Sequence, residues 1–461
     1  MAAIANLDRK MSDAEGLMWR LENDPYLSSA FSNITILDRA PDMERVMRRL
    51  DRATLALPRL RQRVQPAPAN LSAPTWVDDA NFDLRYHVRH IAVPRPGTMR
   101  QLLDIASLIA CDSFDRTRPL WQFVVIDGLR GGRSALITKL HHTITDGEGG
   151  VKLSLEYLDF ERDAPEPEPI TVVDEPDGAD ESPSLGSEIV RSVVSGSLRL
   201  PLGLVRQLRD ILADPTGIPQ AGTAAADTVR SVLNQLGDTD KAKSPLWTER
   251  SISRRMEVLR APYGATRDAA RRLGGKINTA FLTAAAHAAG AYHDQLGSPV
   301  DMLRASMAIS TRTESSGGNA FTLARFLVPT SPMPIAERFR IIQETADSAR
   351  GGSAGPSLDT LAAVAAALPT SVITRLARQQ SQTVDFATSN VRGAPIPMFF
   401  AGAQMLENYP VGPLGGVAFN LTLLSYNHSL DMGVNIDTAA VAEPALLQRC
   451  LSKAFKELVK V

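Results

Sequence analysis

Two adjacent histidines followed by an aspartate and a glycine are the residues of this sequence best suited to chemistry. His141 and His142 end a strand-like run over residues 136–140, and Asp146 and Gly147 follow shortly after them. Histidine can accept a proton near neutral pH because of its ordinary pKa. A hydroxyl that attacks a thioester must lose its proton, and a positioned imidazole accelerates such a step by about 10²–10⁴-fold. The pattern therefore indicates a general base.

The alternative is that both histidines are structural, as most histidine pairs are. The setting favours a functional role, because a strand-like run leads into the pair, a tight turn follows, and an amphipathic helix begins at Val151. A side chain on a loop at the end of a strand is placed to face a cleft. Gly147 has no side chain, so backbone or substrate can approach closely there.

Two other patterns are interpreted as structural. Residues 351–355 match the hydrolase nucleophile pattern Gly-x-Ser-x-Gly, which needs a strand before the serine and a helix after it. Here a helical stretch precedes the serine and Pro356 follows it, so we expect a loop. His87 and His90 are an odd number of positions apart and would face opposite sides of a strand. We therefore expect no metal site.

The elements around the histidine motif alternate between helical and strand-like patterns. Apolar residues recur at helical spacing over residues 42–57 and 99–111, and residues 82–91 alternate as a half-buried strand does. Residues 121–128 and 134–141 are interpreted as two strands separated by a Gly-Gly turn. This mixture predicts an α/β (α+β mixed) lobe over residues 1–160.

The character of the chain changes between residues 161 and 245. Residues 161–184 are rich in proline and acidic residues and are interpreted as an exposed linker. Residues 188–212 form a basic amphipathic pattern, which indicates either a helix packed on a lobe or a contact with an anionic lipid surface. Helical patterns resume afterwards over residues 263–273, 278–293 and 444–461, with strand-like patterns among them, so residues 246–461 are predicted to form a second lobe of mixed type.

Composition limits the possible functions. The net charge is −1, which gives no basic field for binding nucleic acid. With 44% hydrophobic and 22% charged residues, the chain has the composition of a soluble globular protein. We found no signal peptide and no apolar stretch long enough to cross a membrane. We therefore expect a cytoplasmic protein that reaches lipids, if at all, at the surface of the inner membrane or of a lipid droplet.

The histidine motif, written His-His-x-x-x-Asp-Gly, resembles that of the bacterial wax ester synthase/diacylglycerol acyltransferase family, a branch of the coenzyme A-dependent acyltransferases. Further blocks are similar to this family, in its order and over nearly the whole chain. They are Pro119-Leu120-Trp121, residues 386–413 with Ser389 and Asn390, and residues 424–427 with Ser425 and Asn427.

The resemblance implies two lobes of the chloramphenicol acetyltransferase type, joined by a helical crossover, with the active site in a tunnel between them. Acyl-CoA, as a substrate and not a cofactor, and a lipid alcohol would enter from opposite sides. His142 is then the general base of a direct transfer without a covalent intermediate, to diacylglycerol or to a long-chain alcohol. His141 would support the loop, and Asp146 would hold its shape by an ion pair with an arginine.

The resemblance also suggests substrate-binding residues: Pro119, Leu120, Trp121, Asn278, Ser389, Asn390, Ser425 and Asn427. Two positions depart from the family pattern, since Thr279 stands where an aspartate is common and Arg392 where a proline is common. Two alternatives stay open. One is a degenerate relative that binds acyl-CoA or lipid without turnover, and the other is transfer to a different alcohol or from a carrier-bound acyl group. The sequence does not indicate the oligomeric state.

Overall fold

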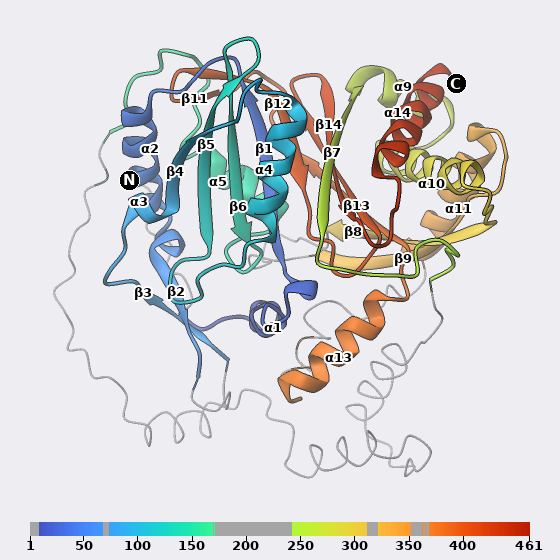
Figure 1. The fold of residues 1–461 in the computed structure, drawn as a ribbon, viewed down its shortest axis with the longest axis horizontal. Coiled ribbons are helices and arrows are strands. Elements are labelled where there is room, and N and C mark those ends of the chain that lie inside the picture. Colours follow the sequence, from blue (N-terminus) through green and yellow to red (C-terminus); the bar gives the residue numbers. More distant parts are fainter. Residues whose placement is uncertain are drawn as a thin grey trace.

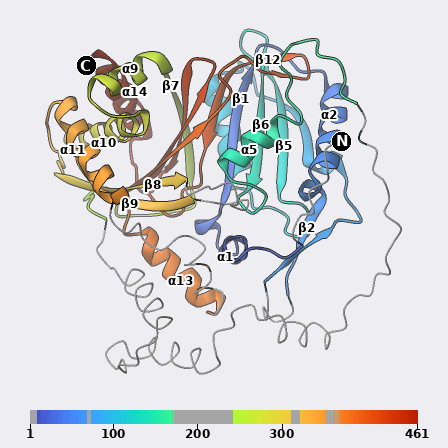
Figure 2. The ribbon, with the colours of Figure 1, turned by 180° about the vertical axis from the view of Figure 1, so that it is seen from behind.

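The computed structural model describes residues 9–67, 73–168, 170, 242–310, 321–351, 362, 365 and 368–461. The basic helix expected at residues 188–212 lies outside these ranges. So do most of the expected linker at 161–184 and of the Gly-x-Ser-x-Gly segment at 351–355. The described parts form two halves, each built on a six-stranded sheet, which lie side by side in Figures 1 and 2. The expected architecture of two sheet-rich lobes is confirmed.

The first sheet carries the histidine motif at the end of one of its central strands. Its apolar side chains alternate between two faces: Phe123 and Val125 pack towards α2 and α5, while Val124 and Ile126 pack towards α4. The predicted strand pair around the Gly-Gly turn is confirmed as an antiparallel hairpin of β5 and β6. The elements are β1 (Ala30–Leu37), α2 (Met43–Ala56), β4 (Val88–Ala92), α4 (Met99–Cys111), β5 (Trp121–Leu129), β6 (Arg133–His141) and α5 (Gly147–Ser154).

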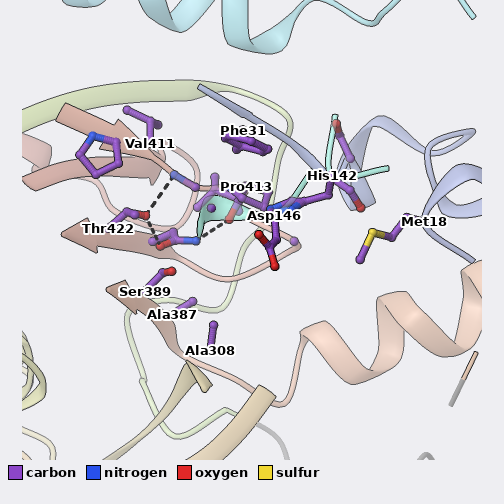
Figure 3. A pocket seen from close by; sticks show the side chains of 18 of the residues that line it. Met18, Phe31, His142, Asp146, Ala308, Ala387, Ser389, Val411, Pro413 and Thr422 are labelled. Carbon is purple, nitrogen blue, oxygen red and sulfur yellow. Dashed lines mark hydrogen bonds between the residues drawn. The ribbon is translucent and has the colours of Figure 1, made fainter. Parts of the chain in front are cut away.

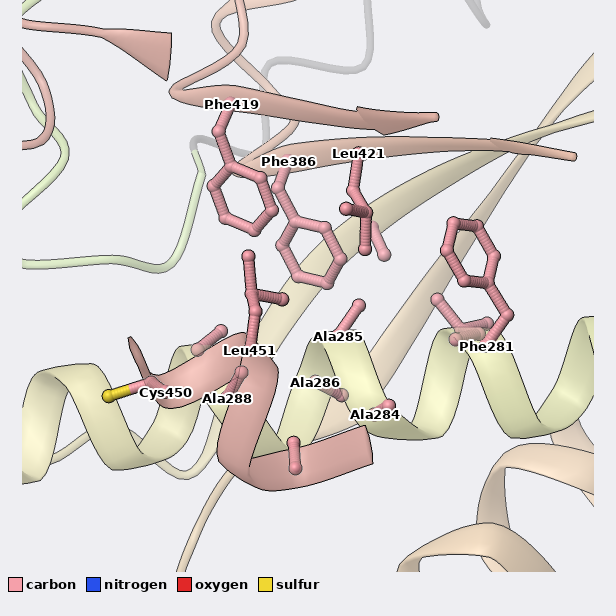
Figure 4. Packing of buried hydrophobic residues seen from close by; sticks show 14 of the residues in the cluster. Phe281, Ala284, Ala285, Ala286, Ala288, Phe386, Phe419, Leu421, Cys450 and Leu451 are labelled. Carbon is pink, nitrogen blue, oxygen red and sulfur yellow. The ribbon is translucent and has the colours of Figure 1, made fainter. Parts of the chain in front are cut away.

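The second sheet is covered on one face by helices around an alanine-rich core. Helix α10 presents Ala284, Ala285 and Ala288 to this core, and these small side chains let Phe386, Leu451 and their neighbours approach closely (Figure 4). The elements are β7 (Arg254–Pro262), α9 (Tyr263–Arg272), α10 (Ile277–Gln295), β8 (Met302–Ser310), β9 (Phe321–Pro329), α11 (Ile335–Gly351), β10 (Phe386–Arg392), β13 (Phe419–Tyr426), β14 (Ser429–Asp437) and α14 (Pro444–Lys460).

One hairpin from the C-terminal part of the chain belongs to the first sheet. Strands β11 (Phe399–Phe400) and β12 (Ala403–Val411) pair antiparallel with each other, and β12 pairs antiparallel with β1 (Figure 1). From the sequence pattern, all of residues 246–461 are expected in the second lobe. Strand pairing between residues so far apart leaves no local pattern, so this exchange between the lobes was not predicted.

The segment at residues 82–91 is not one continuous strand. Asp83 accepts a hydrogen bond from the backbone of Arg85 and caps a single helical turn, α3 (Leu84–His87), before β4 begins. The alternating pattern thus predicted β4 but missed the capped turn. The remaining elements near the N-terminus are α1 (Asp13–Leu21), the short helices η1 (Pro25–Leu27) and η2 (Pro58–Arg61), and the small sheet of β2 (Gln62–Gln65) and β3 (Thr75–Asp78).

Helix α13 (Thr370–Ser381) lies apart from both helical layers. In Figures 1 and 2 it runs below the two halves, next to α1. In the described part of the chain, no helix combines the length and apolar character needed to cross a membrane. The positions of α1 and α13 matter because both border the cavity between the sheets.

Candidate active site

A cavity of about 570 Å³ lies between the two sheets and is lined from both halves of the molecule (Figure 3). Strands β1, β6 and β12 and helix α5 contribute from the first half, and β8, β10 and β13 from the second. Helices α1 and α13 close one end. The loop after β6 brings His142, Asp146 and Gly147 into the wall together. The structure therefore places the predicted base and its loop at the junction of the two lobes.

His142 follows the last residue of β6 and is held by its backbone and by its ring. Its backbone N–H donates to the Ser29 carbonyl (3.2 Å), and its ring packs on Phe31 with 4.7 Å between ring centroids. Burial and, to a smaller extent, the neighbouring His141 together lower the pKa of His142 to about 4, against the opposing charge of Asp146. The imidazole is therefore neutral at physiological pH, which is the form that accepts a proton.

His141 is fully buried and points the other way. The backbone N–H of Thr143 donates to its Nδ1 (3.2 Å), so the ring proton belongs on Nε2. Nε2 lies 3.0 Å from Oε2 of Glu22 and donates to it. The two histidines therefore have different surroundings: His141 anchors the end of β6, whereas His142 faces the cavity.

Glu22 is a positioning residue that was not among the residues predicted from sequence. It accepts hydrogen bonds from the Ser28 hydroxyl (2.7 Å) and the Ser29 backbone (2.8 Å) as well as from His141. Burial by itself raises the pKa of this carboxyl, but these hydrogen bonds outweigh it and hold the pKa below its ordinary value. No sequence signal marks Glu22, because its partner in the motif lies far along the chain.

Asp146 begins helix α5 as its N-cap. Its Oδ1 accepts a hydrogen bond from the backbone N–H of Gly149 (2.7 Å), which fixes the turn after the histidines. A side chain at position 149 would collide with Thr145, and a Cβ at position 147 would lie 3.0 Å from Cγ2 of Val391. The glycines therefore allow the loop to approach β10 of the other half. The expected ion pair of Asp146 with an arginine stays a prediction.

Three of the predicted substrate-binding residues lie at or next to the cavity. Ser389 and Asn390 of β10 line it, and Figure 3 shows Ser389 across from the loop that carries His142. Asn278, near the start of α10, accepts a hydrogen bond from the Asn390 side-chain amide. These residues belong to the lobe opposite His142, so the structure brings together motifs that are remote in sequence.

The Pro119-Leu120-Trp121 motif lies outside the wall of this cavity. All three residues are buried in the first half. Trp121 stacks on His87 with 4.4 Å between ring centroids, and its Nε1 donates to the Leu60 carbonyl (2.8 Å). This placement does not support the predicted contact with substrate. The motif anchors the start of β5 because the large indole ring fills the core and satisfies its N–H there.

Ser425 and Asn427 are also outside the cavity wall. Gly393 donates its backbone N–H to the Ser425 carbonyl (3.1 Å), and Asn427 donates its own to the Ala394 carbonyl (3.0 Å). Asn427 has a φ of 40° in the turn between β13 and β14, a conformation that asparagine tolerates better than most residues. The two residues therefore hold the loop after β10.

The histidines considered for metal binding are engaged elsewhere. Nδ1 of the buried His87 lies 2.8 Å from the Trp121 carbonyl, and His90 pairs with Asp127 on the exposed side of β4 (2.6 Å). Within the described ranges, no three or more His, Cys, Asp or Glu residues are grouped so that they could hold a metal ion.

Comparison with known families gives matches over most of the chain. Residues 11–281 match the wax ester synthase/diacylglycerol acyltransferase catalytic domain, and residues 317–459 match the C-terminal domain of the same family. A putative diacylglycerol O-acyltransferase of Mycobacterium tuberculosis is 31% identical over 98% of this chain and 92% of that protein. A probable diacylglycerol O-acyltransferase of the same species is 28% identical over 95% and 93%.

Solved structures show the same fold. The wax ester synthase/diacylglycerol acyltransferase from Marinobacter aquaeolei VT8 superimposes with a TM-score of 0.67 at 21% identity, over 97% of this chain and 98% of that one. The starter condensation domain of rhizomide synthetase, solved with C8-CoA, gives a TM-score of 0.57 at 11% identity, over 100% and 96%. With both domains matched in order, the chain belongs to the wax ester synthase/diacylglycerol acyltransferase family.

Proposed function

We propose that this protein transfers a long-chain acyl group from acyl-CoA to the hydroxyl of diacylglycerol, and also to long-chain alcohols. The names of the family and of its relatives support both acceptors. The observation that carries the proposal is the neutral imidazole of His142 in the wall of a mainly apolar cavity between two lobes. Such a cavity suits hydrocarbon chains, and it lets two substrates meet at one base.

In the proposed mechanism, His142 acts as a general base in a direct transfer. It accepts the proton of the alcohol as the alcohol oxygen bonds to the thioester carbonyl carbon. The tetrahedral intermediate then collapses, the bond from carbon to sulfur breaks, and His142 returns the proton to the departing thiolate. The products are an ester and free coenzyme A. No covalent acyl-enzyme and no cofactor are required.

The transition state places a positive charge on a buried ring, which costs free energy unless nearby groups compensate. The carboxylates of Asp146 and Glu22 both favour the protonated form of His142, as does its hydrogen bond with the Thr145 backbone. The negative charge that develops on the carbonyl oxygen lies in the same water-poor space and adds to this stabilisation. Asn390 and Ser389 on the opposite wall are the candidates for donors to that oxygen.

The test is the release of free coenzyme A from palmitoyl-CoA, with diacylglycerol or hexadecanol as acceptor. We expect acceptor-dependent release, and a fall of about 10²–10⁴-fold in His142→Ala. The matched control is His90→Ala, which removes an exposed imidazole on the edge strand β4. Release that survives His142→Ala would refute the general-base role. A folded protein that binds palmitoyl-CoA without turnover on either acceptor would instead indicate a binding-only relative.

A further inference from the structure

The cavity differs in character between its two ends. At the end formed by α1 and α13, its wall consists of apolar side chains: Leu17, Met18 and Leu21 from α1, and Ile373, Leu376 and Ala377 from α13. Within each helix these residues are three and four positions apart and share one face. Figure 3 shows Met18 on one side of His142. An alkyl chain that extends from His142 in this direction would meet mainly hydrocarbon along these two helices, with Gln380 and Ser381 lining the cavity only at the last turn of α13.

The opposite end mixes polar with apolar side chains. Ser389, Asn408 and Thr422 line it together with Ala308, Ala387 and Val411, and in Figure 3 Ser389 and Thr422 lie on the other side of His142 from Met18. Placing an alkyl chain there would bury polar groups against hydrocarbon, which is unfavourable. The two ends therefore favour different parts of a substrate, the α1–α13 end the alkyl part and the other end the polar part.

Helix α13 is fastened to the α1 region on both sides of the apolar stretch. Arg20 of α1 donates to the Thr370 hydroxyl (3.2 Å) and the Ala365 carbonyl (3.1 Å) near the start of α13. Near its other end, Arg378 donates to Oδ1 of Asp24 (2.8 Å) and forms an ion pair with it. These contacts hold the two apolar faces at a fixed separation. A larger side chain between the helices therefore takes up space in the cavity and does not push the helices apart.

We infer that the α1–α13 end binds the alkyl chain of a substrate, and that Met18 and Ala377 limit the length of chain that this protein accepts. The inference rests on the proposed acyl transfer, since both the acyl donor and a fatty alcohol carry such a chain. Each methylene removed from water favours binding by about fourfold. A variant in which this end holds a few methylene groups fewer therefore has a much weaker preference for long chains over short ones.

The test fills this end from either wall. Ala377→Phe and Met18→Phe are compared with Gln379→Phe, which adds the same ring to an exposed position of α13. The ratio of kcat/KM for palmitoyl-CoA over hexanoyl-CoA is measured with one acceptor, and the ratio for hexadecanol over hexanol with one donor. We expect at least about a tenfold fall in one of the two ratios in both cavity variants, and none in Gln379→Phe. The ratio that falls identifies the chain as acyl or alcohol.

Unchanged ratios in both cavity variants, or an equal fall in Gln379→Phe, would overturn the inference. If both Ala377→Phe and Met18→Phe prevent folding, Leu376→Ala enlarges the same end. The preference of this variant is then expected to shift towards eicosanoyl over palmitoyl chains.

Binding of a dansyl-labelled undecanoic acid separates this inference from the proposed function. If the unaltered protein binds the probe but releases no coenzyme A from palmitoyl-CoA with either acceptor, and Ala377→Phe abolishes binding of the probe, the chain site stands and the acyl transfer fails. Turnover with an unaltered chain preference in every variant would support the acyl transfer and overturn the chain site.

Discussion

The loop after β6 and the core behind the second sheet use opposite means to fix a structure. In the loop, His141, Glu22 and Asp146 hold the backbone by hydrogen bonds to specific partners. In the core, α10 and α14 pack against the sheet through alanine, leucine and phenylalanine side chains. Hydrogen bonds impose direction on a buried group, whereas apolar packing adds stability without direction. The comparison indicates that the first lobe orients His142, the proposed base, and that the second lobe supplies a rigid wall opposite it.

The largest effect expected in this comparison is on stability, in the second core. Leu451 of α14 is fully buried among α10 and the second sheet (Figure 4). We expect Leu451→Ala to lower the free energy of unfolding by about 2–5 kcal/mol, because it leaves a cavity that the rigid surroundings fill only partly. Denaturant unfolding measures the loss. At a temperature where the variant is folded, kcat should be unchanged, and a matching fall in kcat would break the proposed division between the lobes.

A smaller effect is expected at Glu22. Glu22→Ala leaves the Nε2–H of the buried His141 without its acceptor, which costs about 1–3 kcal/mol. Because the same carboxylate holds the Ser29 backbone that binds His142, kcat should fall as well. Glu22→Gln is the conservative control, since its amide oxygen can still accept from His141, and it should recover most of the activity. Equal losses in both variants would show that the charge matters and not the hydrogen bond.

The pH dependence of activity tests whether the environment of the loop after β6 tunes the pKa of His142. A general base works only when it is unprotonated, so activity should be lost as the pH falls through the pKa of the base. For His142 this pKa is lowered to about 4 by burial, whereas an exposed histidine titrates at about 6.5. We therefore expect the acidic limb of the kcat/KM profile near pH 4, and nearly full activity at about pH 5.5. An acidic limb at the ordinary histidine pKa would show that water reaches the base in the free enzyme.

The smallest effect is expected where the loop touches the other lobe. A methyl group at position 147 would lie 3.0 Å from Cγ2 of Val391, so this side chain must give way slightly. We expect Gly147→Ala to lower kcat severalfold with little change in thermal stability, because a shift of tenths of an ångström moves the loop of the base. Val391→Ala in the same protein removes the contact and should restore the rate. Failure of this rescue would show that the glycine is needed for a reason within its own loop.

Most helices and strands could be predicted because their signals are local. The helical spacing of residues 42–57 and 99–111 became α2 and α4, and the two runs around the Gly-Gly turn became β5 and β6. Helices at 263–273, 278–293 and 444–461 also follow the predicted pattern closely. Where a cap interrupted a strand-like pattern, as Asp83 does before α3, alternation alone gave the wrong element.

The candidate site could be predicted only in part. The spacing of His142, Asp146 and Gly147 within one loop was enough to place them together in the cavity wall. By contrast, Trp121 matched a family motif and yet lies in the core, because the resemblance marks the position of a residue and not the direction of its side chain. Met18 and Ala377 belong to helices whose sequences are ordinary amphipathic patterns, and no local pattern indicates that the two residues line the same cavity.

The sequence by itself determined the chemistry that this protein can offer: a histidine at the end of a strand, a glycine that keeps its loop open, and two sets of alternating elements. Only the tertiary structure decided how that chemistry is tuned. The pKa of His142 depends on its burial in the folded chain, the partner of His141 is a glutamate from the first helix region, and β12 joins a sheet that begins hundreds of residues earlier. Periodicity and caps act between near neighbours, whereas burial and long-range pairing depend on which distant segments pack together.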